Sequence, residues 1–208
     1  MPKTPEQCGQ MREDMKAYIM NESLGYFAKK GLAGTKISQL SKAIGIGQGT
    51  LYSYFASKEE LFQSIIDRAV RENSDSLKTL WQMPLSPKQK IIALSQQMIK
   101  SIYEEEGIAE MFVLNMHVKL EYGETNEITK GYRELPQFIL SNIIEEGQKD
   151  ESFVEGSPAM LADFYWTVVH GISINKICDN ASIYRPTEAQ LIRILIKDDR
   201  TIQNKQST

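Results

Sequence analysis

Apolar residues recur at steps of three and four along most of this chain, and that spacing is the feature that most constrains its fold. In residues 11–30, Met15, Ile19 and Phe27 fall on one side of a helix, and Gly31 provides a C-terminal stop. The alternation of apolar and polar residues that marks half-buried strands is scarce. We therefore predict an all-α protein.

Prolines and capping residues divide the rest of the chain into further helices. Ser57 and Glu60 have the spacing of a capping box, in which each side chain satisfies an otherwise unpaired amide. Ser86-Pro87 combines an N-cap with a proline in the first turn. The expected helices after residue 57 are Lys58–Trp81, Pro87 to about Glu106, shorter pieces through residues 111–122, Pro136–Gln148, Ala159–Cys178, and a last helix after Pro186 that uses Leu191, Ile194 and Leu195.

The composition is that of a globular protein. The chain has 208 residues, of which 41% are hydrophobic and 25% charged, so it can bury a sizeable core. No apolar run is long enough to cross a bilayer, and the polar start lacks a secretory signal, so we expect a cytoplasmic protein. Cys8 and Cys178 have no metal-ligand spacing, and we expect neither a metal site nor a cofactor.

The positive charge of the chain is concentrated at its N-terminal end. Residues 1–58 contain eight Lys or Arg and four Asp or Glu, a net charge of +4, whereas the remainder carries −7 and the whole chain −3. This asymmetry favours attraction of phosphate by the N-terminal part. A solvated lysine-rich surface would account for the same charge.

Residues 37–55 have the pattern of two short amphipathic helices joined by a tight turn. Ile37, Leu40 and Ile44 form one apolar stripe. Gly45 can take the left-handed conformation that ends a helix, and Ile46 fills the angle between the two helices. This spacing predicts a helix-turn-helix or a related helical hairpin.

The second of these helices has an outer face without bulk at its centre. Leu51 and Phe55 lie one turn apart and face inward, so Gly49 and Ser53 point away from the core. A glycine inside a helix costs about 1 kcal/mol relative to alanine, which a purely structural helix would avoid. The missing side chain lets the backbone approach another surface.

The groups around this bare spot suit DNA. Gln48, Thr50, Tyr52 and Tyr54 carry amide and hydroxyl groups that suit base edges and phosphate oxygens. Lys58 follows at the start of the next helix, whose positive end also favours a phosphate. The alternative, a helical hairpin with a polar outer face, does not explain the glycine, the two tyrosines and the lysine together.

The stretch from Gly31 to Phe62, above all GIGQGTLYSYFASKEELF, resembles the signature of the TetR family of repressors. The remainder of the chain matches only in helical pattern, with IIEEGQKDESF at 143–153 resembling the end of the family's first dimer helix. The resemblance implies a helix-turn-helix DNA-binding domain of three helices over residues 1–57. It also implies a helical effector-binding and dimerisation domain over residues 58–208.

The resemblance also assigns DNA contacts. It implies that the recognition helix in the major groove carries Gln48, Gly49, Thr50, Tyr52 and Ser53, and that Thr35, Lys36, Ser38, Tyr54 and Lys58 hold phosphates. The chain departs from the family twice. Family members often have a serine cap and then a lysine where this chain has Gly47 and Gln48, so the base preference cannot be copied. Lys36 also replaces a common threonine cap.

The two long C-terminal helices are expected to pair in a dimer. Repressors with one reading helix per subunit gain affinity by presenting two of them about 34–36 Å apart, so a dimer is needed. The candidate interface residues are Ile139, Ile143, Leu161, Phe164, Tyr165, Val168 and Ile172. The alternative is that both are core helices of a monomer.

Methionine and aromatic side chains are frequent in the segments between the helix expected at Lys58–Trp81 and these two C-terminal helices. Such side chains suit an adaptable apolar ligand pocket. The candidate lining residues are Met98, Tyr103, Met111, Phe112, Met116, Tyr122, Phe138 and Trp166. Any one of them is more often plain core than pocket lining, so the list is a set of candidates. His117 and His170 stand alone and do not form a metal cluster.

These observations favour a ligand-responsive transcriptional repressor that binds a palindromic operator as a homodimer and leaves it when a small-molecule effector binds. A DNA-binding regulator without small-molecule induction, either an activator or a global regulator, stays open. We do not expect an enzyme, because the sequence contains no HExxH motif, no glycine-rich phosphate loop and no arrangement typical of a nucleophilic triad.

Overall fold

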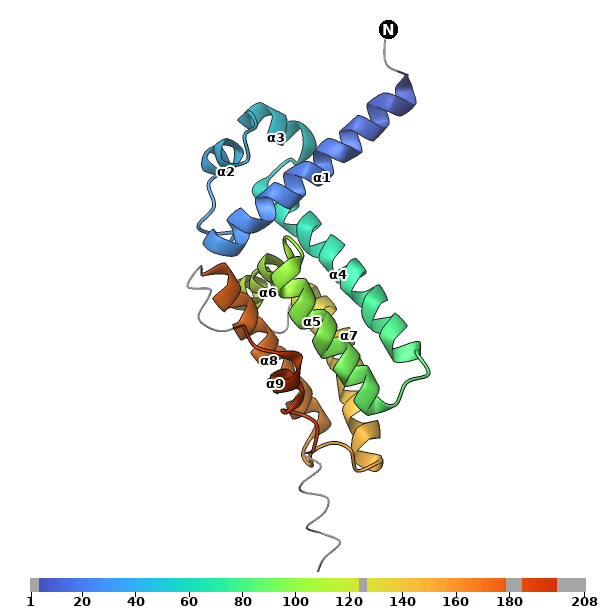
Figure 1. Ribbon diagram of the computed structural model, residues 1–208. Coiled ribbons are helices and arrows are strands. Elements are labelled where there is room, and N and C mark those ends of the chain that lie inside the picture. Colours follow the sequence, from blue (N-terminus) through green and yellow to red (C-terminus); the bar gives the residue numbers. More distant parts are fainter. Residues whose placement is uncertain (1–3, 124–126, 179–184, 198–208) are drawn as a thin grey trace, which may run out of the picture. The chain divides into compact units, whose positions relative to one another are not determined.

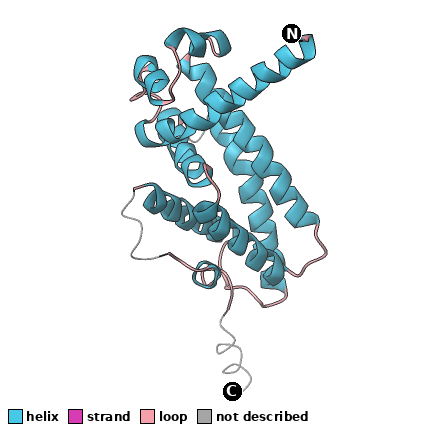
Figure 2. Ribbon diagram, turned by 45° about the horizontal axis from the view of Figure 1, so that its top comes forward, coloured by secondary structure: helices cyan, strands magenta, loops and turns pink. Residues whose placement is uncertain are grey.

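The computed structural model describes residues 4–123, 127–178 and 185–197, and these residues form helices joined by short connections (Figures 1 and 2). The all-α prediction is therefore confirmed over the described residues. The helices are α1 (Pro5–Lys30), α2 (Ile37–Ala43), α3 (Gln48–Tyr54), α4 (Lys58–Gln82), α5 (Pro87–Glu104), α6 (Ile108–Tyr122), α7 (Glu127–Lys149), α8 (Pro158–Ile177) and α9 (Glu188–Ile192).

The chain divides into two compact units, one ending at Val70 and the other beginning at Arg71. The first unit contains α1, α2, α3 and the first half of α4. It thus extends past residues 1–57, which the sequence assigned to the DNA-binding domain. The second unit contains the rest of α4 and the five helices that follow.

In the first unit, α1 begins earlier than the sequence pattern predicted. The helix starts at Pro5, because Thr4 and Gln7 form a reciprocal capping box and proline suits the first turn. Six residues without an apolar stripe therefore precede the predicted start at Met11. The predicted end is confirmed, since Gly31 has a positive φ of 66° and its N–H donates to the carbonyl of Phe27.

Aromatic and branched side chains join α1 to the other helices of the first unit. The rings of Phe27 and Phe62 meet edge to face, with centroids 5.1 Å apart. Phe55 and Leu51 are buried in the same unit, so the helix-turn-helix shares a core with α1 and α4. The buried apolar residues are Ile19, Met20, Leu24, Phe27, Ala28, Leu32, Leu40, Ile44, Leu51, Phe55, Leu61, Phe62, Ile65, Ile66 and Ala69.

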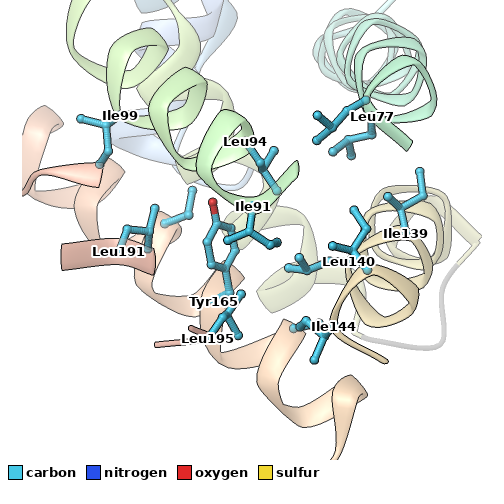
Figure 3. Close-up of a cluster of buried hydrophobic side chains, with 14 of the residues drawn as sticks. Leu77, Ile91, Leu94, Ile99, Ile139, Leu140, Ile144, Tyr165, Leu191 and Leu195 are labelled. Atoms are coloured by element: carbon cyan, nitrogen blue, oxygen red, sulfur yellow. The ribbon is translucent and has the colours of Figure 1, made fainter. Parts of the chain in front are cut away.

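The core of the second unit lies among α5, α7, α8 and α9, and it also contains Leu77 and Leu80 of α4 and Ala109 of α6. Figure 3 shows Tyr165 of α8 inside this cluster, with Ile91 of α5, Leu140 of α7 and Leu195 around it. The Tyr165 hydroxyl lies 3.0 Å from the Ser95 hydroxyl, so a buried polar group finds a partner in an apolar core. Burial raises the pKa of Tyr165, and its hydroxyl therefore stays protonated.

Helix boundaries in the second unit differ from the prediction at α7, α6 and α9. Pro136 was expected to begin a helix, but it lies inside α7, which begins at Glu127. A proline inside a helix costs about 3 kcal/mol. Leu135 and Ile139, on either side of it, pack in or against the core of the unit. Residues 111–122 were expected as short pieces and belong to one helix, α6. The remaining predicted starts and ends agree to within two residues, except that α9 ends early at Ile192.

The connection between α7 and α8 is fixed to the end of the described chain. Phe153 is fully buried and forms an isolated antiparallel bridge with Ile196. The N–H of Val154 donates to the carbonyl of Leu195, and the N–H of Lys197 donates to that of Ser152. These bonds close one end of the helical cluster.

Candidate nucleic-acid interface

The turn between α2 and α3 has the geometry that the sequence predicted. Gly45 has a φ of 74°, in the left-handed region that favours glycine. The N–H of Ile46 donates to the carbonyl of Ser41, which closes the end of α2. Gly47 is the N-cap of α3 and, lacking a side chain, makes no side-chain capping bond.

The outer face of α3 is exposed and has a bare centre. Gln48, Gly49, Thr50 and Ser53 are exposed, and the side chain of Tyr52 is 47% exposed. A Cβ added at Gly49 would meet no atom within 4 Å, so no residue that the structure describes requires a glycine there.

Residues of α1 hold the carboxyl ends of both helices. The Tyr18 hydroxyl donates to the carbonyl of Ile44 at 3.0 Å, just past α2. The Arg12 guanidinium donates through Nη2 to the carbonyl of Ser53 at 3.1 Å and lies 4.9 Å from the centre of the Tyr54 ring. Sequence reasoning missed both contacts, because α1 is far from α3 in the chain and no local pattern links them.

Two residues assigned to phosphate contacts have partners inside the protein. Thr35 is 2% exposed and its hydroxyl donates to the carbonyl of Gly31, so its side chain is not at the surface. The Lys58 ammonium donates to the carbonyls of Leu32 and Thr35 at 2.9 and 3.0 Å. It therefore joins the start of α4 to the loop before α2, with one N–H left for another acceptor. Lys36 and Ser38 are exposed.

Comparison with known proteins identifies the family. Residues 19–65, which run from α1 through α2 and α3 into α4, match the family model for bacterial regulatory proteins, tetR family. Residues 19–65 therefore carry the DNA-binding region of the TetR family. The chain's α2 and α3 are the DNA-binding helix-turn-helix of a TetR-family transcription regulator, and the protein is not an enzyme.

Similarity to other transcription regulators extends past the helix-turn-helix. The chain is 24% identical to the fatty acid metabolism regulator protein of Bacillus subtilis (strain 168), over 69% of this chain and 73% of that protein. It is 26% identical to the HTH-type transcriptional repressor KstR2 of Rhodococcus jostii (strain RHA1), over 69% of this chain and 72% of that protein. The crystal structure of the regulator FadR from Bacillus subtilis in complex with stearoyl-CoA shares the fold, with a TM-score of 0.61 and 16% identity over 86% of this chain and 94% of that one.

In the second unit, the side chains proposed to line a TetR-type ligand pocket lie mostly at the edge of the core. Met111 is buried, and Phe112 is partly buried against the core. Phe138 is 56% exposed and packs on Trp81, so it lies outside the core. A surface hollow of about 310 Å³ is lined by Trp81 with Lys78 and Gln82. Met98, Tyr103 and Trp166 also pack against the core, and Met116 and Tyr122 are half-buried.

Polar groups on α6 and α8 lie among these apolar side chains. The His170 ring meets the Phe112 ring edge to face, with centroids 5.7 Å apart. Burial lowers the pKa of His170, with a further lowering by Lys119 and an opposing hydrogen bond to the backbone of Trp166. Among the described residues, neither Asn115 Oδ1 nor the indole Nε1 of Trp166 has a hydrogen-bond partner, although both atoms are buried.

The candidate dimer residues fall into two groups. Ile139, Ile143, Tyr165 and Ile172 are buried in the core of the second unit itself. Leu161 and Val168 are partly buried, and Phe164 is 56% exposed. The sequence pattern did not separate these groups, because both faces of α8 are apolar. Two further exposed side chains, Phe138 on α7 and Met160 on α8, were not assigned to the interface.

No helix in the described ranges is both long and apolar enough to cross a membrane.

Proposed function

We propose that this TetR-family protein is a ligand-responsive repressor that binds a palindromic operator as a homodimer. The observation that carries the proposal is the exposed face of α3, where Gly49 lies open between Gln48 and Ser53. Such a face admits the backbone of a short helix to the major groove, with polar side chains on both sides. We propose that the protein acts in the cytoplasm.

Exposed apolar side chains on α7 and α8 support a homodimer. Phe138, Met160 and Phe164 are 56%, 74% and 56% exposed. Side chains of this size contribute most when a partner buries them. We propose that two copies of α7 and α8 pair through them, which would present two α3 helices to one operator.

We propose a lipophilic effector that binds in the second unit. The apolar lining of α5, α6 and α8 supports this class, as do relatives named for fatty acid metabolism or solved with stearoyl-CoA. Acyl-CoA thioesters are therefore the first compounds to test. A coupling of about 1–3 kcal/mol between effector and operator would change operator affinity about 5- to 150-fold.

Selection of bound fragments from random duplex DNA tests the DNA-binding part. We expect a palindrome whose half-sites are separated by one helical turn or a multiple of it, because a symmetric dimer presents identical helices. Recovery of sites without two-fold symmetry would overturn the proposal that a homodimer binds a palindromic operator. Gln48→Ala serves as the matched variant, and it should change the preferred bases within each half-site.

Thermal unfolding with acyl-CoAs of short, medium and long chains tests the effector. We expect stabilisation by a subset of chain lengths together with release of the selected operator, whereas free coenzyme A should do neither. Stabilisation without release would contradict the inducible mechanism. Binding of DNA that no compound of a metabolite library alters would favour a regulator without small-molecule input.

A further inference from the structure

Arg12 of α1 contacts the recognition helix α3 at its carboxyl end, next to Tyr54, the last residue of that helix. Its Nη2 donates to the Ser53 carbonyl at 3.1 Å, and its Cζ lies 4.9 Å from the Tyr54 ring centroid. The guanidinium therefore both caps the carboxyl end of α3 and stacks on a tyrosine. A cation at this end is favourable, because the last carbonyls of a helix carry partial negative charge.

The face of α1 that meets α3 is positively charged. Arg12 and Lys16 lie one turn apart on that face, and Lys16 Nζ lies 5.6 Å from the Phe55 ring centroid. Asp14 lies on the other side of the helix, where it accepts a hydrogen bond from Gln10. Glu13 is adjacent to Arg12 in sequence but projects about 100° away around the helix, and no ion pair joins the two side chains among the described contacts.

Most of the hydrogen-bonding capacity of Arg12 is unused in the protomer. A guanidinium has five N–H donors, and the described contacts of Arg12 use one of them. Arg12 is also exposed, whereas the ammonium of Lys58 gives two of its three donors to carbonyls inside the protein. Of these two cations next to the helix-turn-helix, Arg12 has the greater capacity to bind a phosphate.

We propose that Arg12 and the Tyr54 hydroxyl bind the same phosphate of the DNA backbone. The Ser53 carbonyl and the Tyr54 ring fix the guanidinium, so its remaining donors are held in place before DNA arrives. The first turns of α1, residues 5–12, then have a role that the recognition helix alone does not provide. This inference rests on the proposed function, since it requires an operator.

The salt dependence of operator binding tests the proposal. Each lost phosphate contact reduces the slope of log affinity against log salt by about 0.9, and a dimer loses two. We expect Arg12→Gln to reduce the slope by about 1.8, with the preferred operator sequence unchanged. Arg193→Gln, an exposed arginine of the second unit, removes the same charge and should leave the slope unchanged.

A purely structural role for Arg12 predicts a different result. In that case Arg12→Gln lowers affinity while the slope stays at the wild-type value, and the proposal is overturned. Tyr54→Phe provides a second test. If both groups bind one phosphate, the double variant should lose less operator affinity than the product of the two single-variant losses. Independent, multiplicative effects would also contradict a shared phosphate.

A measurement on the wild-type protein adds a readout that does not depend on the operator affinity of a variant. The Nε–Hε resonance of Arg12, assigned by comparison with Arg12→Lys, should shift when the selected operator is added. An unchanged resonance in an operator-bound sample would overturn the proposal. Absence of binding to any duplex by the wild-type chain would instead overturn the proposed function.

Discussion

At the scale of single residues, a substitution of Gly49 should change the stability of the protein and its affinity for DNA in opposite directions. An added Cβ meets nothing in the protomer, so Gly49→Ala should raise the free energy of unfolding by up to about 1 kcal/mol. The same methyl group should lower operator affinity, because it would stand between the backbone of α3 and the DNA. Urea unfolding and operator titration measure the two effects.

Gly25 of α1 provides the control for this substitution. A Cβ there also meets no neighbour, so Gly25→Ala should raise stability without lowering operator affinity. Equal operator affinity for Gly49→Ala and the wild type would show that the backbone of α3 does not approach the DNA closely.

His170 makes the stability of the second unit depend on pH. Burial lowers the pKa of this imidazole below the ordinary value of about 6.5, so the unfolded chain binds a proton more readily than the folded one. The resulting stability is present above about pH 6.5 and is lost as the pH falls through and below that value. His170→Phe keeps an aromatic ring against Phe112 and should lose less stability between about pH 7.5 and about pH 5.5. Urea unfolding at both pH values checks this, and equal losses would assign the pH dependence to other groups.

At the scale of elements, the end of α7 depends on a glycine. A Cβ at Gly147 would lie 2.7 Å from the ring of Phe153, which is fully buried and cannot move outward without breaking the bridge to Ile196. Gly147→Ala should therefore lower the free energy of unfolding by about 1–3 kcal/mol. Gly171→Ala in α8, where a Cβ meets nothing, should not destabilise the protein. Similar stabilities of the two variants would contradict the packing of Phe153 on Gly147.

The sequence predicted the existence of the helices better than their starts. Apolar periodicity and capping boxes are local signals, so the helices that begin at Lys58 and Pro87 were placed correctly. The first turns of α1 carry no apolar stripe, because residues 5–14 are exposed, and periodicity could not detect them. Pro136 was misread for a related reason: packing around Leu135 and Ile139 outweighs a local preference that the sequence displays.

The candidate site could be predicted only in part for the same physical reason. Helical geometry alone puts Gly49 and Ser53 opposite Leu51 and Phe55, and the structure has this arrangement. The partners of Lys58, and the contact between Arg12 and Ser53, join residues 23 to 41 positions apart. Such contacts depend on how helices pack, which one sequence does not display.

At the scale of the whole molecule, Phe164 tests whether operator affinity depends on dimerisation. Its side chain is 56% exposed on α8, so Phe164→Glu should leave the fold intact and place a charge in the proposed interface. We expect a monomer in sedimentation analysis and a loss of affinity for a two-half-site operator of about a hundredfold or more, because binding loses its second anchor. Affinity for a single half-site should be unchanged.

Leu120 of α6 is the matched control for this charge. It is 81% exposed, and Leu120→Glu should stay dimeric with normal operator affinity. A Phe164→Glu protein that still sediments as a dimer would place the interface on another surface of the second unit.

The hydrogen bonds from Lys58 to the carbonyls of Leu32 and Thr35 lie entirely within the first unit, and they couple α4 to the turn that precedes α2. A displacement of α4 would therefore move α2 and α3 together with it, without changing how these helices pack on one another. Operator libraries selected with and without an effector should then contain the same half-site motif, but the amount of DNA recovered should differ. Regulation of this kind adjusts how tightly a site is occupied and leaves the choice of site to the amino acids of α3.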